Sequence, residues 1–195
     1  MTIELPPDAA RPIAVVLSSQ FGHLCRGVEI AASSIDDTTG HTDAAYGGRV
    51  FLHHYCVHLA GPNRDLAVAD FPADARAARG FNGDIAQDAR RWRDAAAHEE
   101  SEMLGRRVAR KTLLAVAGLV SIHDQTWTTD RAYAARRWSQ VEPHRAEHLA
   151  RLLAWSERRS QPSRPQVVDM LDDTVDPIVA VFAELIGLWD GPSGP

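Results

Sequence analysis

Cysteine, lysine and long apolar runs are scarce in this chain of 195 residues, and each shortage excludes a class of protein. Two cysteines, Cys25 and Cys56, cannot build a disulfide framework, so we expect both thiols to be reduced. No apolar run approaches the roughly 20 residues that a membrane-spanning helix needs. Residues 1–12 also lack the basic start and apolar core of a signal peptide. These features predict a cytoplasmic protein that does not act on membranes.

The charged residues are mostly arginine and carboxylates, and the formal net charge is −5. Because a nucleic-acid backbone needs a basic surface, this balance argues against nucleic acid as the main partner. A local basic cluster, formed by Arg106, Arg107, Arg110 and the single lysine Lys111, can still hold one phosphorylated ligand.

The run from Met103 to Trp138 predicts a helical hairpin around which the rest of the chain packs. Apolar residues recur there at the steps of one helical face: Leu104, Val108, Ala115, Leu119 and Ile122. A short polar turn carries Trp127 and ends in three candidate N-caps, Thr128, Thr129 and Asp130. Such a broad apolar surface must be buried by further helices.

Similar patterns predict the other elements. We expect helices over residues 8–24, 49–60, 72–79, 84–98, 143–158 and 166–189, a strand over 27–33 and a loop over 34–48. The pattern over 49–60 also fits a strand, and we favour the helix. Gly80 and Gly83 are expected to stop the third of these helices, and Pro177 to kink or split the last. The expected fold class is mainly α, a bundle of six or seven helices with a small N-terminal α/β remnant. The expected domains are residues 1–48 for the remnant, 49–190 for the bundle and 191–195 for a flexible tail.

Residues 121–138 (SIHDQTWTTDRAYAARRW) and 143–155 (PHRAEHLARLLAW) resemble the C-terminal helical domain of aminoglycoside adenylyltransferase-like nucleotidyltransferases. The resemblance covers roughly residues 50–190 and rests on the order of the helices. It implies a catalytic mixed-sheet domain before the bundle, with a substrate cleft completed by the helices. It also implies a nucleotide, Mg²⁺ and a small-molecule hydroxyl acceptor as ligands.

The metal-binding motifs of that family are missing here. The family grips the triphosphate with a Gly-Ser turn and holds two Mg²⁺ ions with an Asp-x-Asp pair and a third carboxylate. This sequence has neither motif, while Glu29 stands where the third carboxylate is expected. The resemblance therefore implies a chain that begins after its metal-binding half, with Glu29 as the base once that half and Mg·ATP are supplied. For the lone chain we expect weak nucleotide binding or none, and no turnover.

By the same resemblance, Arg106, Arg107 or Arg110 would meet the triphosphate, while Trp127 and Asp130 would line the acceptor cleft. The residues themselves leave other roles open, because a tryptophan in such a turn often belongs to the core and Asp130 can cap the following helix. The arginines after Asp130 suit an anionic or neutral acceptor better than a polycation.

Two other patterns point to different chemistry. The cluster His53, His54, Cys56 and His58 offers two or three ligands for zinc, but no fourth ligand is evident, so no metal site is predicted. The Arg93–His98 spacing matches the Arg-x4-His pattern of HEPN-type ribonucleases, in which the arginine steadies a phosphate and the histidine is acid or base.

A third hypothesis is a non-enzymatic helical binding module that docks on a catalytic partner chain. An exposed strand at residues 27–33 would be an edge available for pairing with another sheet. A homo-oligomer would also satisfy such an edge.

Overall fold

The computed structural model describes residues 10–24, 40–55 and 71–189. The chain divides into two compact units, Met1–Gly40 and His41–Pro195. In the first unit, helix α1 (Ala10–Phe21) confirms the predicted helix as far as it is described. The predicted strand 27–33 and Glu29 lie outside the described residues. No described helix combines the length and the apolar character required to cross a membrane.

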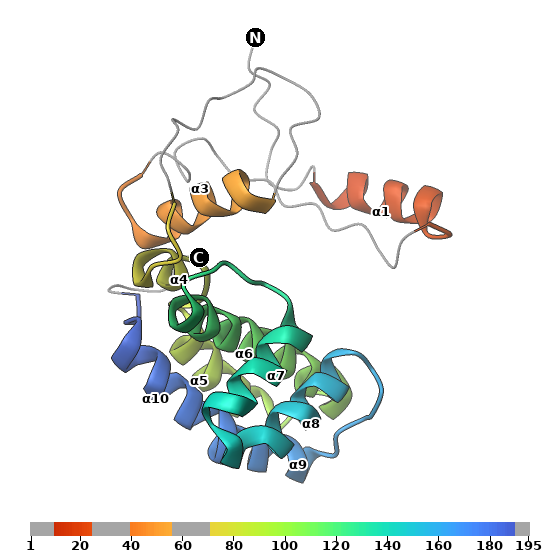
Figure 1. Cartoon of the computed structure of the whole chain (residues 1–195). Coiled ribbons are helices and arrows are strands. Elements are labelled where there is room, and N and C mark those ends of the chain that lie inside the picture. The colour runs from red at the N-terminus through yellow and green to blue at the C-terminus, as the bar shows by residue number, and fades with distance from the viewer. Residues whose placement is uncertain (1–9, 25–39, 56–70, 190–195) are drawn as a thin grey trace. The chain divides into compact units, whose positions relative to one another are not determined.

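The described part of the second unit is built from helices (Figure 1). They are α3 (Asp43–Tyr55), α4 (Ala75–Asn82), α5 (Ile85–Ala95), α6 (Ser101–Asp124), α7 (Arg131–Val141), a 3₁₀ turn (Pro143–Arg145), α8 (Ala146–Ser156), α9 (Arg164–Met170), a π-helical turn (Leu171–Val175) and α10 (Asp176–Leu185). All elements of the described residues are helical, which confirms the mainly α class. The predicted domain boundary at residues 48 and 49 falls inside α3.

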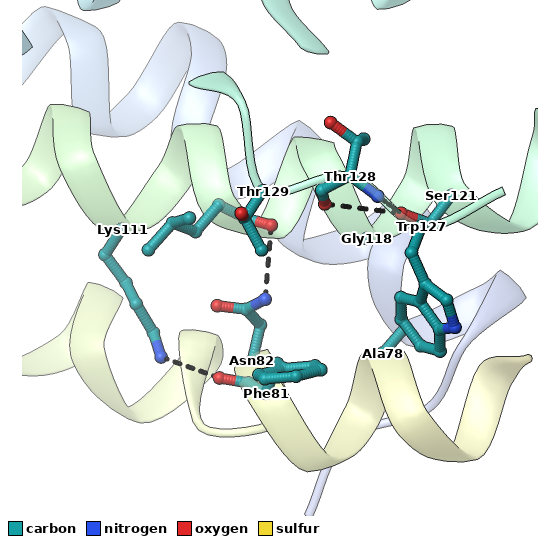
Figure 2. A pocket seen from close by; sticks show the side chains of 10 residues that line it. Ala78, Phe81, Asn82, Lys111, Gly118, Ser121, Trp127, Thr128 and Thr129 are labelled. Carbon is teal, nitrogen blue, oxygen red and sulfur yellow. Dashed lines mark hydrogen bonds between the residues drawn. The ribbon is translucent and has the colours of Figure 1, made fainter. Parts of the chain in front are cut away.

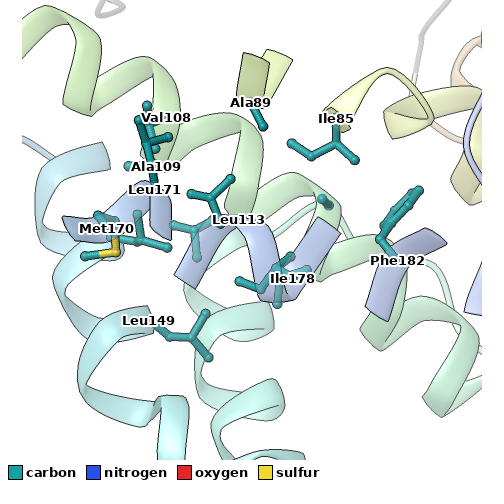
Figure 3. Close-up of a cluster of buried hydrophobic side chains, with 14 of the residues drawn as sticks. Ile85, Ala89, Val108, Ala109, Leu113, Leu149, Met170, Leu171, Ile178 and Phe182 are labelled. Carbon is teal, nitrogen blue, oxygen red and sulfur yellow. The ribbon is translucent and has the colours of Figure 1, made fainter. Parts of the chain in front are cut away.

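Helix α6 is the central element of this unit. It packs against α4, α5, α7, α8, α9 and α10. Its side chains Val108, Ala109 and Leu113 lie in one cluster with Leu149 of α8 and Ile178 of α10 (Figure 3). Side chains on several sides of the helix, including Leu104, Val116 and Leu119, are at most 2% exposed. Because apolar burial is the main favourable term in folding, the stability of the unit depends on this helix being surrounded.

The last part of the chain confirms the expected effect of Pro177. Instead of one helix over residues 166–189, α9 gives way to the π-helical turn, and α10 begins at Asp176 with Pro177 in its first turn. Proline has no N–H to donate to the preceding turn. The wider π turn before it accommodates the chain without that hydrogen bond.

Two sequence predictions were wrong, and both concern the contact between α3 and α4. The loop predicted for residues 34–48 ends early, because α3 already begins at Asp43, where Ala45 N donates to Thr42 Oγ1 at 3.1 Å. Gly80 does not stop α4, which continues to Asn82. A Cβ on Gly47 would lie 2.5 Å from the carbonyl carbon of Gly80, so the two glycines allow the helix backbones to touch.

Two glycines inside α6 give a matched prediction. A Cβ at Gly118 would meet Phe182 and Ala78 at 3.4 Å or more, which is ordinary contact, so Gly118→Ala should stabilise the chain by up to about 1 kcal/mol through helix propensity. A Cβ at Gly105 would lie 2.4 Å from the Pro162 ring, so Gly105→Ala should destabilise by about 1–3 kcal/mol. Urea denaturation of both variants measures the two shifts. Shifts of the same sign would contradict the described packing of α6.

Candidate functional site

A small pocket opens between α4, α6 and the loop that joins α6 to α7 (Figure 2). Its volume is about 100 Å³. The residues around it are Ala78, Phe81, Asn82, Lys111, Leu114, Gly118, Ser121, Trp127, Thr128 and Thr129. Three segments that are distant in sequence therefore contribute to one concave site.

The loop after α6 creates the pocket because it turns back along the helix. Gln125 takes a left-handed conformation with φ of 54°, which ends α6. Thr126 N then donates to Ser121 O at 3.0 Å, and Thr128 N donates to Ser121 Oγ at 3.0 Å. The Ser121 hydroxyl itself donates to Ala117 O at 2.8 Å. These bonds hold Thr128 and Thr129 over the groove between α4 and α6.

The apolar wall of the pocket consists of the rings of Trp127 and Phe81. Their centroids lie 6.0 Å apart at an angle of 70°, so the edge of one ring packs on the face of the other. The indole Nε1 donates to Phe71 O at 2.9 Å, which fixes the orientation of Trp127. Phe51 of α3 packs on Phe81 with centroids 6.4 Å apart and is 47% exposed. The wall therefore continues from the pocket onto an exposed aromatic surface.

The polar groups of the pocket include the amide of Asn82 and the ammonium group of Lys111. Asn82 is only 5% exposed and donates through Nδ2 to Leu114 O at 3.1 Å, while no described residue donates to its Oδ1. Lys111 Nζ forms an ion pair with Asp84 at 2.7 Å and donates to Phe81 O at 3.3 Å. Because Asp84 neutralises this charge, the pocket itself is not strongly cationic.

The residues predicted for a substrate cleft take different positions. Trp127 lines the pocket and also packs on the small second core around Val50, Phe71 and Ala77. Asp130 does not line it; this side chain caps α7 by accepting from Ala132 N at 2.9 Å and Tyr133 N at 3.0 Å. A direct substrate role for either residue stays a prediction.

The residues predicted to bind nucleotide do not line this pocket. Arg107 forms an ion pair with Glu99, and this hydrogen bond raises the pKa of Arg107. Arg106 and Arg110 are half-buried and form no ion pair with a carboxylate of the described residues. The catalytic prediction for Glu29 lies outside the described residues.

The competing patterns can be placed in part. His53 and His54 are exposed on α3 with ring centroids 4.8 Å apart, and Cys56 and His58 lie outside the described residues. Where the chain is described, no group of three or more side chains is arranged to hold a metal ion. The guanidinium of Arg93 bonds to both Asp172 and Asp176, so the arginine of the ribonuclease pattern already has two carboxylate partners. The ribonuclease hypothesis stays a prediction.

Comparison with known proteins adds no relative. No family model matches the chain, and neither a curated protein nor a solved structure matches it. The resemblance to adenylyltransferases therefore remains a prediction from sequence.

The contact between α3 and α4 through Arg79, here called the joint, holds the aromatic wall in place. Arg79 donates to Asp43 from Nε at 2.5 Å and from Nη2 at 3.3 Å, and donates through Nη1 to Ile186 O at 2.7 Å. One arginine thus ties α3, α4 and the end of α10 together. The hydrogen bonds from Arg79 lower the pKa of Asp43, against the smaller opposite effect of burial.

This joint predicts a pH-dependent stability. Since the pKa of Asp43 is lower in the folded chain, its contribution is complete above the ordinary aspartate pKa and is lost as the pH falls through the folded value. Asp43→Asn should therefore cost about 1 kcal/mol at neutral pH, and the difference from wild type should shrink below about pH 4. Denaturation in urea across a pH series measures it. Asp169→Asn, at an exposed position in α9, is the control that should show no such trend. A cost for Asp43→Asn that does not change down to the acid limit would contradict the assignment.

Proposed function

We propose that the His41–Pro195 unit is a helical binding module whose pocket anchors one side chain of a protein partner. The observation that carries this proposal is a pocket of about 100 Å³ whose aromatic wall continues onto the exposed ring of Phe51. Interfaces between proteins are commonly held by one or two side chains inserted into such pockets, with aromatic surface around them.

The size of the pocket supports a small inserted group over a nucleotide. Pockets for cofactors and drug-sized molecules measure about 300–1,000 Å³, and a closed cavity of about 150 Å³ holds one benzene. A volume of about 100 Å³ accepts a group of the size of one aliphatic side chain, but not a nucleotide together with its acceptor. The geometry therefore favours an anchor site over an active-site cleft.

The side chains that line the pocket indicate which kind of group would fit into it. Phe81, Trp127 and Leu114 offer apolar contact, while the Oδ1 atom of Asn82 offers a hydrogen-bond acceptor. A side chain that is apolar along its length, next to a backbone or side-chain N–H, satisfies both parts. An inserted group without such an N–H would leave the nearly buried Oδ1 of Asn82 unpaired, which costs about 1–3 kcal/mol.

The proposal predicts which substitutions block binding. Leu114 lines the pocket and is half-buried, so Leu114→Trp should fill it. Peptides selected from a displayed random library against the full chain should share one aliphatic or aromatic anchor residue. Leu114→Trp, or replacement of the anchor by alanine, should weaken their binding by about tenfold or more.

Val168→Trp is the matched control, because Val168 is 40% exposed on α9 and does not line the pocket. This variant should bind the selected peptides as wild type does. The proposal fails if no peptide is enriched over the bare support, or if the selected peptides bind Leu114→Trp as well as they bind wild type.

The resemblance to nucleotidyltransferases adds an expectation about the partner, namely that it carries the missing Gly-Ser turn and Asp-x-Asp pair. The lone chain should then release no pyrophosphate from Mg·ATP in the presence of hydroxyl acceptors. Release that Glu29→Gln abolishes would show a complete active site in this chain and would contradict the binding-module proposal.

A further inference from the structure

The two faces of α6 that carry basic side chains differ in how their charges are balanced. Lys111 pairs with Asp84, and Arg107 pairs with Glu99. Arg106 and Arg110, one helical turn apart, pair with no carboxylate of the described residues. Within the described part of the chain, two guanidinium groups are therefore left on one side of the helix without a counter-charge at ion-pair distance.

The return of the loop along α6 brings a third arginine to this side. Thr129 lines the same pocket as Leu114 and Lys111, and Arg131 follows two residues later as the first residue of α7. Arg131 is half-buried. Burial lowers the pKa of Arg131, and the charges of Arg110 and Arg106 lower it further. Helix α7, which begins at Arg131, packs on α6, so Arg131 joins the two arginines that lie one turn apart on that helix.

The two carboxylates that act on Arg131 are engaged elsewhere. Asp130 and Glu157 act on the pKa of Arg131 in the opposite direction, yet neither forms an ion pair with it. The Asp130 carboxylate caps α7, and Glu157 forms an ion pair with Arg159. In addition, Arg106 Nε is buried and has no hydrogen-bond partner among the described residues. A buried donor without an acceptor beside like charges is unfavourable, and a bound anion would both accept from the donor and reduce the repulsion.

We infer that Arg106, Arg110 and Arg131 form a binding site for a phosphate or diphosphate group of a small-molecule ligand. Guanidinium groups bind phosphate through paired N–H···O bonds and keep their charge when half-buried. Three of them match a group with two or more negative charges better than a single carboxylate. A nucleic acid fits less well, because the chain carries a net charge of −5 and a nucleic-acid backbone needs an extended basic surface. This site is separate from the pocket residues, and the inference does not rest on the proposed partner binding.

Isothermal calorimetry and thermal unfolding of the full chain with sodium pyrophosphate test this inference, with sodium chloride keeping the ionic strength constant. Pyrophosphate should bind wild type and raise its unfolding temperature. Arg110→Gln and Arg131→Gln should each weaken binding by about tenfold or more, because each removes a charge-assisted contact. Without pyrophosphate, Arg131→Gln should unfold at a higher temperature than wild type, because the mutual repulsion is reduced. A purely structural arginine would give the opposite shift.

Arg136→Gln is the control, since Arg136 is exposed on the same helix as Arg131. It should bind pyrophosphate as wild type does. Three results would each overturn the inference: no binding to wild type, equal binding to the Arg110→Gln and Arg131→Gln variants, or an equal effect of sulfate at the same ionic strength. An RNA oligonucleotide whose binding depends on Arg110 and Arg131 but which pyrophosphate does not displace would assign the site to nucleic acid instead.

Discussion

The enclosure of α6 by six other helices is the constraint on which the rest of the structure depends. A helix that is apolar on several sides cannot remain in water, so α4, α5, α7, α8, α9 and α10 must each present an apolar face to it. Its basic side chains other than His123 lie in the N-terminal half, from Arg106 to Lys111, and its acidic side chains, Glu102 and Asp124, lie at its two ends. The second half, from Leu113 to Ser121, is almost entirely buried.

Both candidate sites result from the way in which the chain leaves this helix. A tight turn at Gln125 and the bonds from Thr126 and Thr128 to Ser121 send the loop back along α6. On one side, the loop covers the groove to α4 and forms the pocket beneath Trp127. On the other side, it starts α7 with Arg131, whose pKa is lowered by burial and by Arg110 and Arg106. A single local hydrogen-bond pattern thus arranges an apolar anchor site and a cluster of cations.

Those features that depend on local periodicity could be predicted from the sequence. Apolar residues from Leu104 to Ile122 recur at helical spacing, and they mark α6, whereas Pro177 marks the break before α10. The capping role of Asp130, one of the two roles left open, follows from its place before an amphipathic helix. Each of these signals lies within a few residues of the element that it determines.

What could not be predicted depends on contacts between distant segments. Gly80 lies inside α4 and does not end it. It packs against Gly47 of α3, which occupies the space that a side chain at position 80 would fill. Trp127 is oriented by the carbonyl of Phe71, 56 residues earlier, so the sequence could place it in a turn but not in a pocket wall. Asn82 and Leu114 likewise meet only because α4 packs on α6.

Native-state hydrogen exchange on the full chain tests the central role of α6 most directly. If the enclosed helix holds the unit together, the amides from Val108 to Val120 should exchange only through global unfolding, and more slowly than those of α3 or α8. Exchange of these amides through a lower-energy opening, while α8 and α10 stay protected, would contradict the account.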